Sequence, residues 1–515
     1  DGAIGALFTR WNDGPLASYL VQSTGRILAL RDERNGGPLL DTIDDAAGQK
    51  GTGAWASMAA LESGGARRQS SWTPDGSGFA RVTVVDGHDH SEDAARFIEK
   101  GVNYIVEPLN EKNYIKVLSK QLSKGDLLIN LSVEVDSLAL IAWCQKAGVL
   151  YIDTCIEPWP GGYTDPDLSP GERSSQAFRA RALALRAQIG PGRPTAVICQ
   201  GANPGLVSQL VKLGLLELAQ ALGRPVVPPP DAVGWAGLFR EHGIRTIQVS
   251  EHDSQVSRTP RAADEFVSTW SVDGFLGEGS QPAELGWGTA EAALPADGRR
   301  PTADGPGVYL LRPGVDVRVR SWAPAAGPFV GYLITHMESL SIAEHLTLRE
   351  QGRVVYRPTV HYAYCPCPDA ILSLHDLLAR GFAPPPRARI LAEDIVSGQD
   401  ELGVLLAGHP KGAFWFGSQL AIAEARAIVP HANATALQVA AGILGGMAAA
   451  CAEPALGLVE PDELDFRRVL AVARPYLGRL VGAWSDWTPL TGRGRLFPES
   501  LDHSDPWRFA NVRVA

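Results

Sequence analysis

Short apolar runs rich in β-branched residues alternate with segments of helical period over residues 81–199. Such runs predict buried strands, and the amphipathic segments between them predict helices that connect parallel strands. Strands are expected at residues 82–85, 102–106, 127–131, 150–152 and 195–199, and helices from Ser91 onward and at residues 110–122 and 138–147. This alternation predicts an α/β fold with a Rossmann-like, doubly wound parallel sheet.

The pattern changes after a proline-rich stretch at residues 226–230. Alternating runs at residues 246–250, 307–311, 315–319 and 332–335 predict a second, α+β domain with a mixed sheet. We therefore expect a Rossmann-like NAD-binding domain over residues 76–225 and a substrate-binding and dimerisation domain over residues 226–515. Residues 433–452 predict a buried helix that returns to the first domain. Residues 1–75 form an atypical N-terminal segment, for which an insertion, a partial or disordered stretch and foreign sequence all remain open.

The composition of the 515 residues, 45% hydrophobic and 20% charged, is typical of a soluble globular protein. The longest apolar run, residues 439–452, is shorter than the roughly 18 residues of a membrane span, so no membrane partner is expected. The start of the sequence shows no secretion signal, which predicts a cytoplasmic protein. Six scattered cysteines predict reduced thiols, and Cys365 and Cys367 lack the second pair of a metal site. A net charge of −10 without a basic stripe argues against nucleic acid as a partner.

Tryptophans and carboxylates are interleaved over residues 267–288. An indole face attracts an organic ammonium by about 0.5–2 kcal/mol, and a carboxylate adds a charge-assisted hydrogen bond. Trp270, Glu278, Glu284 and Trp287 are therefore candidates for one wall of a cation-binding site. The alternative, given equal weight, is a solvated strand edge with two core tryptophans.

Asp86 stands at the end of the second predicted strand, where an acidic residue commonly accepts hydrogen bonds from the adenosine ribose of a dinucleotide. In this role it would favour NAD over NADP; a turn or helix-capping aspartate is the alternative. The glycine-rich turn expected about 20 residues upstream is not there. Gly2 and Gly5 are the remaining candidates for the tail of such a loop.

Three predicted strands end in small, amide or acidic residues, at the edge of the sheet where ligands bind. These exits carry Asn130, Leu131 and Ser132; Thr154 and Glu157; and Ala202 and Asn203. Their backbones would allow a dinucleotide to approach closely, and Glu157 would reach past the nicotinamide toward a substrate. The alternatives are an exposed loop acid for Glu157 and a turn amide before proline for Asn203.

The chain also carries, in order, the strings INLSV, YIDT, EPW, DPDL, GANPG, STWSV, GEGSQPAELGWGT, VRSW, HYAY, ELGVLL and GSQL. In these strings the chain resembles bacterial-type homospermidine synthases, NAD-dependent enzymes related in fold to saccharopine dehydrogenase. The resemblance covers residues 79–515 and leaves out residues 6–75. The chain departs from the family pattern in the missing glycine-rich turn, in Glu134 where the family tends to have aspartate, and in the CPCPD string at residues 365–369.

The resemblance implies that NAD takes a hydride from putrescine to give an imine, that a second putrescine displaces ammonia, and that the retained hydride reduces the new Schiff base. It also implies a homodimer and a substrate cavity. The cavity would be lined by Glu157, Asn203, Glu251, Trp270, Glu278 and His336. Trp270 would stabilise a cation, Glu251 and Glu278 would hold ammonium groups, and the other three would lie near the reacting carbon; the general base stays unassigned.

Two other functions remain open. A saccharopine dehydrogenase-like NAD(P) oxidoreductase would accumulate reduced cofactor and would require arginines for a substrate carboxylate. A relative that binds polyamines without turnover would follow from the incomplete N-terminal cofactor loop.

Overall fold

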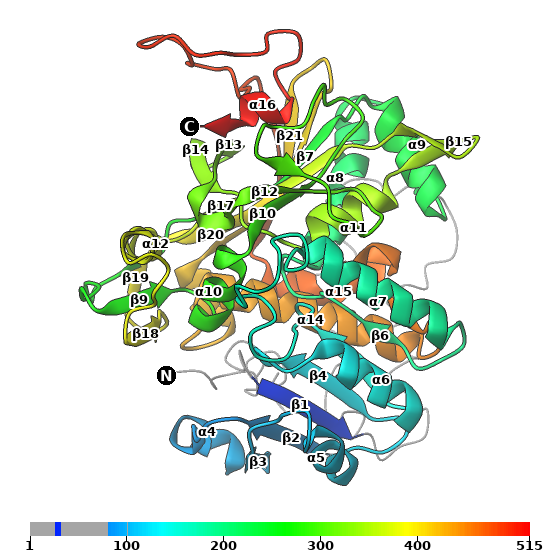
Figure 1. Ribbon diagram of the computed structural model, residues 1–515, viewed down its shortest axis with the longest axis vertical. Helices are drawn as coiled ribbons and strands as arrows, with labels where there is room; N and C mark the ends of the chain where they lie inside the picture. Colours follow the sequence, from blue (N-terminus) through cyan, green and yellow to red (C-terminus); the bar gives the residue numbers. More distant parts are fainter. Residues whose placement is uncertain (1–25, 32–80, 100, 515) are drawn as a thin grey trace.

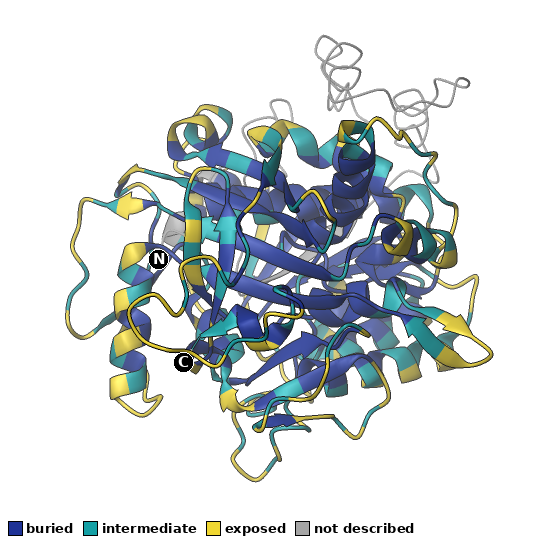
Figure 2. Ribbon diagram, turned by 90° about the horizontal axis from the view of Figure 1, so that it is seen from above, coloured by how far each residue is buried: buried dark blue, intermediate teal, exposed yellow. Residues whose placement is uncertain are grey.

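The computed structural model describes residues 26–31, 81–99 and 101–514 (Figure 1). Gly2 and Gly5 lie outside these residues, so their proposed role in a cofactor loop stays a prediction. The described residues form two large sheets and three two-stranded ones, with helices packed against and between the large sheets (Figure 1). Figure 2 shows that the strands are buried inside the molecule, whereas exposed residues gather on the peripheral helices and loops.

The first sheet has seven strands among the described residues. Their order is β22 (Leu458–Val459), β6 (Ala196–Val197), β5 (Leu150–Asp153), β4 (Leu127–Leu131), β1 (Arg26–Arg31), β2 (Arg81–Asp86) and β3 (Asn103–Val106). The pairs β2–β3, β4–β5, β5–β6 and β6–β22 are parallel. The Rossmann-like parallel sheet expected from the hydrophobic pattern is thus confirmed, and β4 has the bounds that the pattern predicts.

Four described helices belong to this part of the chain, and the last two begin with a polar cap. They are α4 (Ser91–Ile98), α5 (Tyr114–Gln121), α6 (Ser137–Ala147) and α7 (Ser175–Ile189). The side chain of Asp136 accepts a hydrogen bond from Ala139 N at the start of α6, and Ser174 does the same with Ala177 N at the start of α7. Because these caps satisfy otherwise unpaired N–H groups, they fix where each helix begins.

Strand β1 is the exception in the first sheet. It lies between β2 and β4 and runs antiparallel to both, with Ile27 opposite Val85 on one side and Asn130 on the other. Its direction thus differs from that of both neighbours in the sheet. It comes from the N-terminal segment for which the sequence predicts no structure.

The second sheet is mixed, as expected, and has eleven strands among the described residues. Its main path runs β11 (Gly298–Arg299), β12 (Gly307–Pro313), β10 (Pro282–Gly286), β17 (Thr359–Cys365), β7 (Thr246–Asp253), β20 (Gln399–Ala407), β21 (Ala413–Ala421) and β23 (Arg479–Ser485). Off this path lie β13 (Arg318–Ala323), β14 (Gly327–Tyr332) and β24 (Arg513–Val514). Of these strands, β7 and β17 pair in parallel, and β20 continues antiparallel on the other side of β7.

Two of the strands expected in this half are placed differently. Gly314–Asp316 forms a short 3-10 helix before β13, so the expected strand at residues 315–319 begins late. The expected strand at residues 332–335 ends at Tyr332, where β14 stops. Buried valines alternate with the exposed Asp316 and Arg318 over residues 315–319, whereas residues 332–335 are all buried, and neither pattern by itself separates a turn from a strand.

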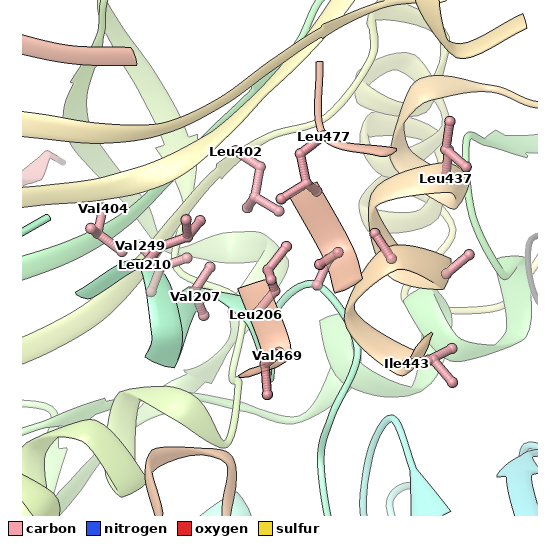
Figure 3. Close-up of a cluster of buried hydrophobic side chains, with 14 of the residues drawn as sticks. Leu206, Val207, Leu210, Val249, Leu402, Val404, Leu437, Ile443, Val469 and Leu477 are labelled. Carbon is pink, nitrogen blue, oxygen red and sulfur yellow. The ribbon is translucent and has the colours of Figure 1, made fainter. Parts of the chain in front are cut away.

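Two apolar helices join the sheets, α8 (Leu206–Ala221) and α14 (Ala434–Ala452). Figure 3 shows side chains of α8 and α14 meeting Val249 of β7 and Leu402 of β20 in one buried cluster. Helix α14 is the one described helix long and apolar enough to cross a membrane, but 89% of its most apolar window is buried inside the protein. It is a core helix, as its sequence predicts.

Gly442 allows α14 to approach the first sheet closely. A Cβ atom at this position would lie 1.9 Å from the carbonyl oxygen of Gly201, in the loop that follows β6. Gly446, one turn on, faces Ile152 of β5 and Gln200 just as closely. Helix α14 therefore packs directly against β5 and the loop after β6.

Gly442→Ala is expected to lower the thermal unfolding midpoint by about 2–6 °C, because overpacking costs about 1–3 kcal/mol. Activity should fall as well, since the loop of Gly201 carries Asn203. The matched control is Gly237→Ala in α9 (Ala232–Glu241), where a Cβ atom meets nothing within 4 Å. Calorimetric scans of both variants check the prediction; equal midpoints would contradict it.

Candidate functional site

The parallel strands bring Asp86 and the exits of β4 and β5 to the same edge of the first sheet. Asp86 is the last residue of β2, and its carboxylate is buried. It accepts hydrogen bonds from Tyr104 Oη at 2.7 Å and from His88 N at 3.1 Å, and it lies 3.1 Å from His90 Nδ1. Among its described contacts, the carboxylate thus orders the turn after β2 at the place where a ribose would bind.

Asn130 organises the exit of β4. Its Oδ1 accepts from Ser132 Oγ at 2.5 Å and from Ser132 N at 3.2 Å, and its Nδ2 donates to Tyr151 Oη at 3.2 Å. Leu131 lies between them with its side chain in the core. These polar side chains bond to one another. A ligand could therefore approach the backbone of this exit closely.

Glu157 lies at the end of the β5 exit and is buried. Its carboxylate accepts hydrogen bonds from Glu134 N at 3.0 Å and from Cys155 Sγ at 3.1 Å. Burial raises the pKa of Glu157 to about 7; the two hydrogen bonds oppose the rise, and the charge of Glu278 adds to it. Glu157 is therefore a buried group that can gain or lose a proton near neutral pH, and not the exposed loop acid of the alternative interpretation.

Asn203 lies in a tight turn, in which Gly201 N donates to Pro204 O at 2.7 Å and α8 begins directly afterwards. Gly205 closes this turn at a φ of 122°, where a Cβ atom would lie 2.5 Å from Gly201 N. The turn directs Asn203 Nδ2 to Glu251 Oε2 of β7, at 2.6 Å. It thereby joins the edge of the first sheet to the second sheet. Beside it, Ala202 is buried against the core.

Glu251 is buried on β7 and also accepts a hydrogen bond from Tyr362 Oη of β17 at 2.5 Å. Burial raises the pKa of Glu251 to about 7, although the hydrogen bonds from Tyr362 and Asn203 and the charge of His336 oppose the rise. The parallel pairing of β7 with β17 places these groups side by side.

His336 lies between two carboxylates. Its Nε2 is 2.9 Å from Glu278 Oε2 on α10 (Val272–Ser280), and its Nδ1 is 3.3 Å from Glu338 Oε1. Its ring packs on that of Tyr362 with centroids 4.4 Å apart. Burial by itself lowers the pKa of His336, but the neighbouring carboxylates of Glu338 and Glu278 outweigh this effect and raise the pKa to about 10. At neutral pH the ring is an imidazolium that donates to both acids.

Trp270 stands just before α10 and is half-buried. Its Nε1 donates to Tyr364 Oη at 3.1 Å, and its ring stacks on Phe275 with centroids 5.0 Å apart. Tyr364 in turn stacks on Tyr362 at 5.3 Å. The indole is thus fixed to β17, the strand whose Tyr362 bonds to Glu251.

Contacts therefore link five of the six predicted site residues into one cluster. His336 bonds to Glu278 and packs on Tyr362, Tyr362 and Asn203 bond to Glu251, and Tyr364 holds Trp270. Glu157 joins them electrostatically, since the charge of Glu278 raises its pKa. The acids that the sequence places far apart converge where the first sheet meets the second.

Glu284 and Trp287 do not belong to this cluster, so their place in a cation-binding wall is wrong. Glu284 is buried on β10 and accepts from Ser175 N at 2.7 Å and Gln176 N at 3.2 Å, at the start of α7. Trp287 packs on Phe509 in a separate hydrophobic cluster. Trp270 and Glu278 thus lie in the cluster, where their binding role stays a prediction, and the core interpretation holds for Trp287.

The sequence analysis missed Glu338, Tyr362, Tyr364 and Cys155. Two signals were available: the HYAY string places Tyr362 and Tyr364 two residues apart, on one face of a strand, and Glu338 follows His336 by two residues. Thr154 lies against Gly201 with its methyl group. Within the described ranges, no group of three or more histidine, cysteine or acidic residues could hold a metal ion, and all six cysteines are free thiols.

Comparison with known proteins identifies the relatives of most of the chain. Residues 74–197 match the model of the saccharopine dehydrogenase NADP binding domain, and residues 201–485 match that of the saccharopine dehydrogenase C-terminal domain. A homospermidine synthase of Blastochloris viridis is 50% identical over 441 residues, which cover 84% of this chain and 92% of that protein. The chain belongs to the homospermidine synthase family. The resemblance inferred from the sequence strings is confirmed.

Two further relatives agree with this assignment. A homospermidine synthase of Mesorhizobium japonicum is 45% identical over 443 residues, covering 84% of this chain and 91% of that protein. The crystal structure of homospermidine synthase from Legionella pneumophila in complex with NAD aligns with a TM-score of 0.78 at 42% identity. It covers 84% of this chain and 91% of that structure. The α/β fold with two sheets is therefore that of the homospermidine synthase family.

The N-terminal segment has different relatives. Residues 1–116 match the model of the 6-phosphogluconate dehydrogenase C-terminal domain. An NAD(+)-dependent, decarboxylating 6-phosphogluconate dehydrogenase of Bacillus subtilis is 51% identical over 61 residues, or 12% of this chain and 13% of that protein. This short match gives the N-terminal segment a relative that the sequence analysis did not recognise.

Proposed function

We propose that the chain converts two molecules of putrescine into homospermidine and ammonia with NAD as a catalytic cofactor and without net oxidation or reduction. The observation that supports this function is a buried group of acids beside Trp270: Glu278 contacts His336, and Glu251 is held by Asn203 and Tyr362. Glu157 lies close enough for the charge of Glu278 to raise its pKa. A diamine carries two positive charges at neutral pH, and a buried group of acids with an indole beside it suits such a substrate.

The described residues fit NAD at both of its ends. Asp86 stands where the adenosine ribose of a dinucleotide is held in this fold, and its carboxylate fits NAD better than a ribose phosphate. The exits of β4 and β5, with Asn130, Leu131, Ser132 and Thr154, and the turn with Ala202 would line its path to the chamber. Bound there, NAD would supply a hydride acceptor and later return the hydride.

Glu278 and Trp270 are proposed to hold the ammonium groups of the diamine. Glu278 is the more accessible carboxylate of the chamber, with 18% of its side chain exposed, whereas Glu251 is almost fully enclosed. Glu251 would hold the more deeply placed ammonium together with Asn203, which already bonds to it. The face of Trp270 would stabilise the cationic imine after hydride loss.

Glu157 is proposed as the general base. Hydride leaves a neutral amine far more readily than an ammonium, so one proton must first pass from the reacting nitrogen to the protein. A pKa of about 7 matches this task at neutral pH, whereas a protonated His336, with a pKa of about 10, cannot accept a proton. His336 would instead keep Glu278 and Glu338 in place.

With NAD as the hydride acceptor, the first putrescine would become an iminium ion, the amine of the second putrescine would replace ammonia at its carbon, and the hydride would return to the new iminium. Glu157 would take the proton of the first ammonium and pass it to solvent, and would then take the proton of the second ammonium and give it to the departing ammonia. The secondary amine of the product would regain a proton from solvent.

The test is incubation of the protein with putrescine and several millimolar NAD, followed by separate assays of homospermidine, ammonia and NADH. Homospermidine and ammonia in equal amounts without accumulating NADH would support the proposal. Accumulating NADH without homospermidine would overturn it in favour of a saccharopine dehydrogenase-like oxidoreductase. No arginine is among the residues that build the chamber, which disfavours a substrate carboxylate.

Putrescine binding is expected to weaken as the pH falls. The pKa values of Glu157 and Glu251 are about 7, so each carboxyl goes from about nine-tenths ionised at pH 8 to about one-tenth at pH 6. The diamine stays doubly charged over this range, since alkylamines titrate near pH 10. KM for putrescine should therefore rise about tenfold from pH 8 to pH 6. A KM that does not change between these values would contradict the protonation of either acid.

We further propose that the protein works as a cytoplasmic homodimer. The six free thiols of the described chain fit a reducing compartment. Light scattering on the purified protein tests the dimer.

A further inference from the structure

Tyr163 lies in the turn that follows Glu157, where Asp165 N donates a hydrogen bond to Gly161 O at 2.7 Å. The turn brings the phenol back to the residues before it. Its Oη donates a hydrogen bond to Ile156 O and lies 3.5 Å from Glu157 Oε1. Burial, and after it the charge of Glu157, raises the pKa of Tyr163 well above its usual value, so the hydroxyl stays protonated and remains a donor.

The ring of Tyr163 contacts helices from both halves of the chain. It meets the ring of Phe178 on α7 edge-on, with centroids 5.1 Å apart. A Cβ atom at Gly277 of α10 would lie 3.6 Å from Cδ2 of the tyrosine ring, which is an ordinary van der Waals distance. Gly277 directly precedes Glu278 in that helix. The phenol therefore reaches Glu157 with its hydroxyl and the helix of Glu278 with its ring.

This contact differs from the other hydrogen bonds that hold Glu157. Glu134 N and Cys155 Sγ also donate to its carboxylate, but both lie in the first half of the chain. Tyr163 instead connects the loop of Glu157 to α10. Because packed side chains yield little, the size of this ring sets the spacing between that loop and the helix of Glu278. In the proposed reaction Glu157 acts at the reacting nitrogen and Glu278 holds an ammonium group, so their spacing has to match the length of the diamine.

We infer that Tyr163 is a specificity-determining residue, whose ring keeps the loop of Glu157 and the helix of Glu278 at the spacing that suits putrescine and disfavours longer diamines. This inference rests on the proposed function. Tyr163 needs no contact with the reacting atoms for this role, since it acts through the positions of the two acids. A shorter side chain at this position would leave room for one more methylene group. A methylene group in an apolar pocket changes relative rates by about 10-fold to 200-fold.

The experiment measures kcat/KM for putrescine and for cadaverine, the diamine with one more methylene group, each as the sole amine at saturating NAD, from the ammonia released. Tyr163→Leu is expected to shift the ratio of the two values at least about tenfold toward cadaverine. Tyr163→Phe keeps the ring and should leave the ratio within about threefold of the parent. Trp159→Leu is the matched control, because Trp159 lies in the same turn but packs on Tyr114 of α5, with centroids 5.8 Å apart. It should also leave the ratio unchanged. Tyr163→Met takes the place of the leucine variant if that variant does not fold.

Three results would overturn the inference: an unchanged ratio in a folded Tyr163→Leu variant; an equal shift in Tyr163→Phe, which would assign the effect to the hydroxyl; or an equal shift in Trp159→Leu, which would assign it to the turn as a whole. Failure of the proposed function would look different, because calorimetry on the NAD complex gives the same comparison as a ratio of dissociation constants. A parent protein that binds putrescine and forms no homospermidine would contradict the function alone. A parent protein that binds neither diamine would contradict both.

Discussion

Glu157→Gln is expected to lower kcat for homospermidine formation by about 100-fold to 10,000-fold, the usual contribution of a general base. Glutamine keeps the size of the side chain, and its one carbonyl oxygen can still accept the hydrogen bond from Glu134 N, but it cannot take the proton of the reacting ammonium. KM for putrescine should change by less than about fivefold, because Glu251 and Glu278 still hold the diamine. Steady-state kinetics at saturating NAD provide the measurement.

The pH profile separates a base from a residue with only a structural role. In the parent protein kcat should rise with pH through about 7, where Glu157 loses its proton. In Glu157→Gln this rise should disappear, and Glu157→Asp should regain part of the rate. Glu172→Gln, which changes an exposed glutamate, serves as the control and should leave kcat unchanged. A Glu157→Gln variant that keeps the parent rate and profile would assign the proton transfer to another group.

Glu278→Gln is expected to lower kcat/KM for putrescine by about 100-fold. A hydrogen bond between charged groups contributes about 1.5–3 kcal/mol, and each 1.4 kcal/mol is a factor of ten. The substitution removes the carboxylate that His336 Nε2 contacts at 2.9 Å and leaves a positive ring facing the substrate ammonium. Most of the loss should appear in KM. Initial rates over a range of putrescine concentrations check this.

Glu284→Gln is the matched control, since Glu284 lies in the same stretch of sequence and is also a buried acid. Its carboxylate holds the backbone N–H groups of Ser175 and Gln176. Its replacement should lower the thermal unfolding midpoint and leave KM for putrescine within about twofold. Equal rises of KM in both variants would argue that the stretch acts as a whole and that Glu278 has no special role.

The hydrophobic pattern predicted the local elements well wherever strands and helices alternate. The bounds of β4 match the prediction at both ends, and the predicted buried helix at residues 433–452 is α14. The pattern failed at residues 315–319, which begin in a 3-10 helix, and at residues 332–335, which lie at and beyond the end of a strand. Alternating burial also occurs in a turn, and a turn that is fully buried is as apolar as a strand, so the pattern cannot distinguish them.

The site shows the same division. The sequence singled out Trp270 and Trp287 together, but only Trp270 lies with the acids, and Trp287 is a core residue beside Phe509. Glu278 and Glu284 are likewise six positions apart and end in different environments. Glu278 lies on helix α10 and contacts His336, whereas Glu284 lies on strand β10 and contacts the start of α7. The difference depends on the directions of the helix and the strand.

The sequence by itself determined the Rossmann-like pattern of the first half, the mixed sheet of the second and the family to which the chain belongs, because these depend on local periodicity and on residue strings. Only the tertiary structure decided that Asn203 and Tyr362 both meet Glu251, because strand pairing and the packing of α14 against the Gly201 turn bring together groups 48 and 111 positions apart. It also decided the direction of β1, which runs antiparallel to both β2 and β4.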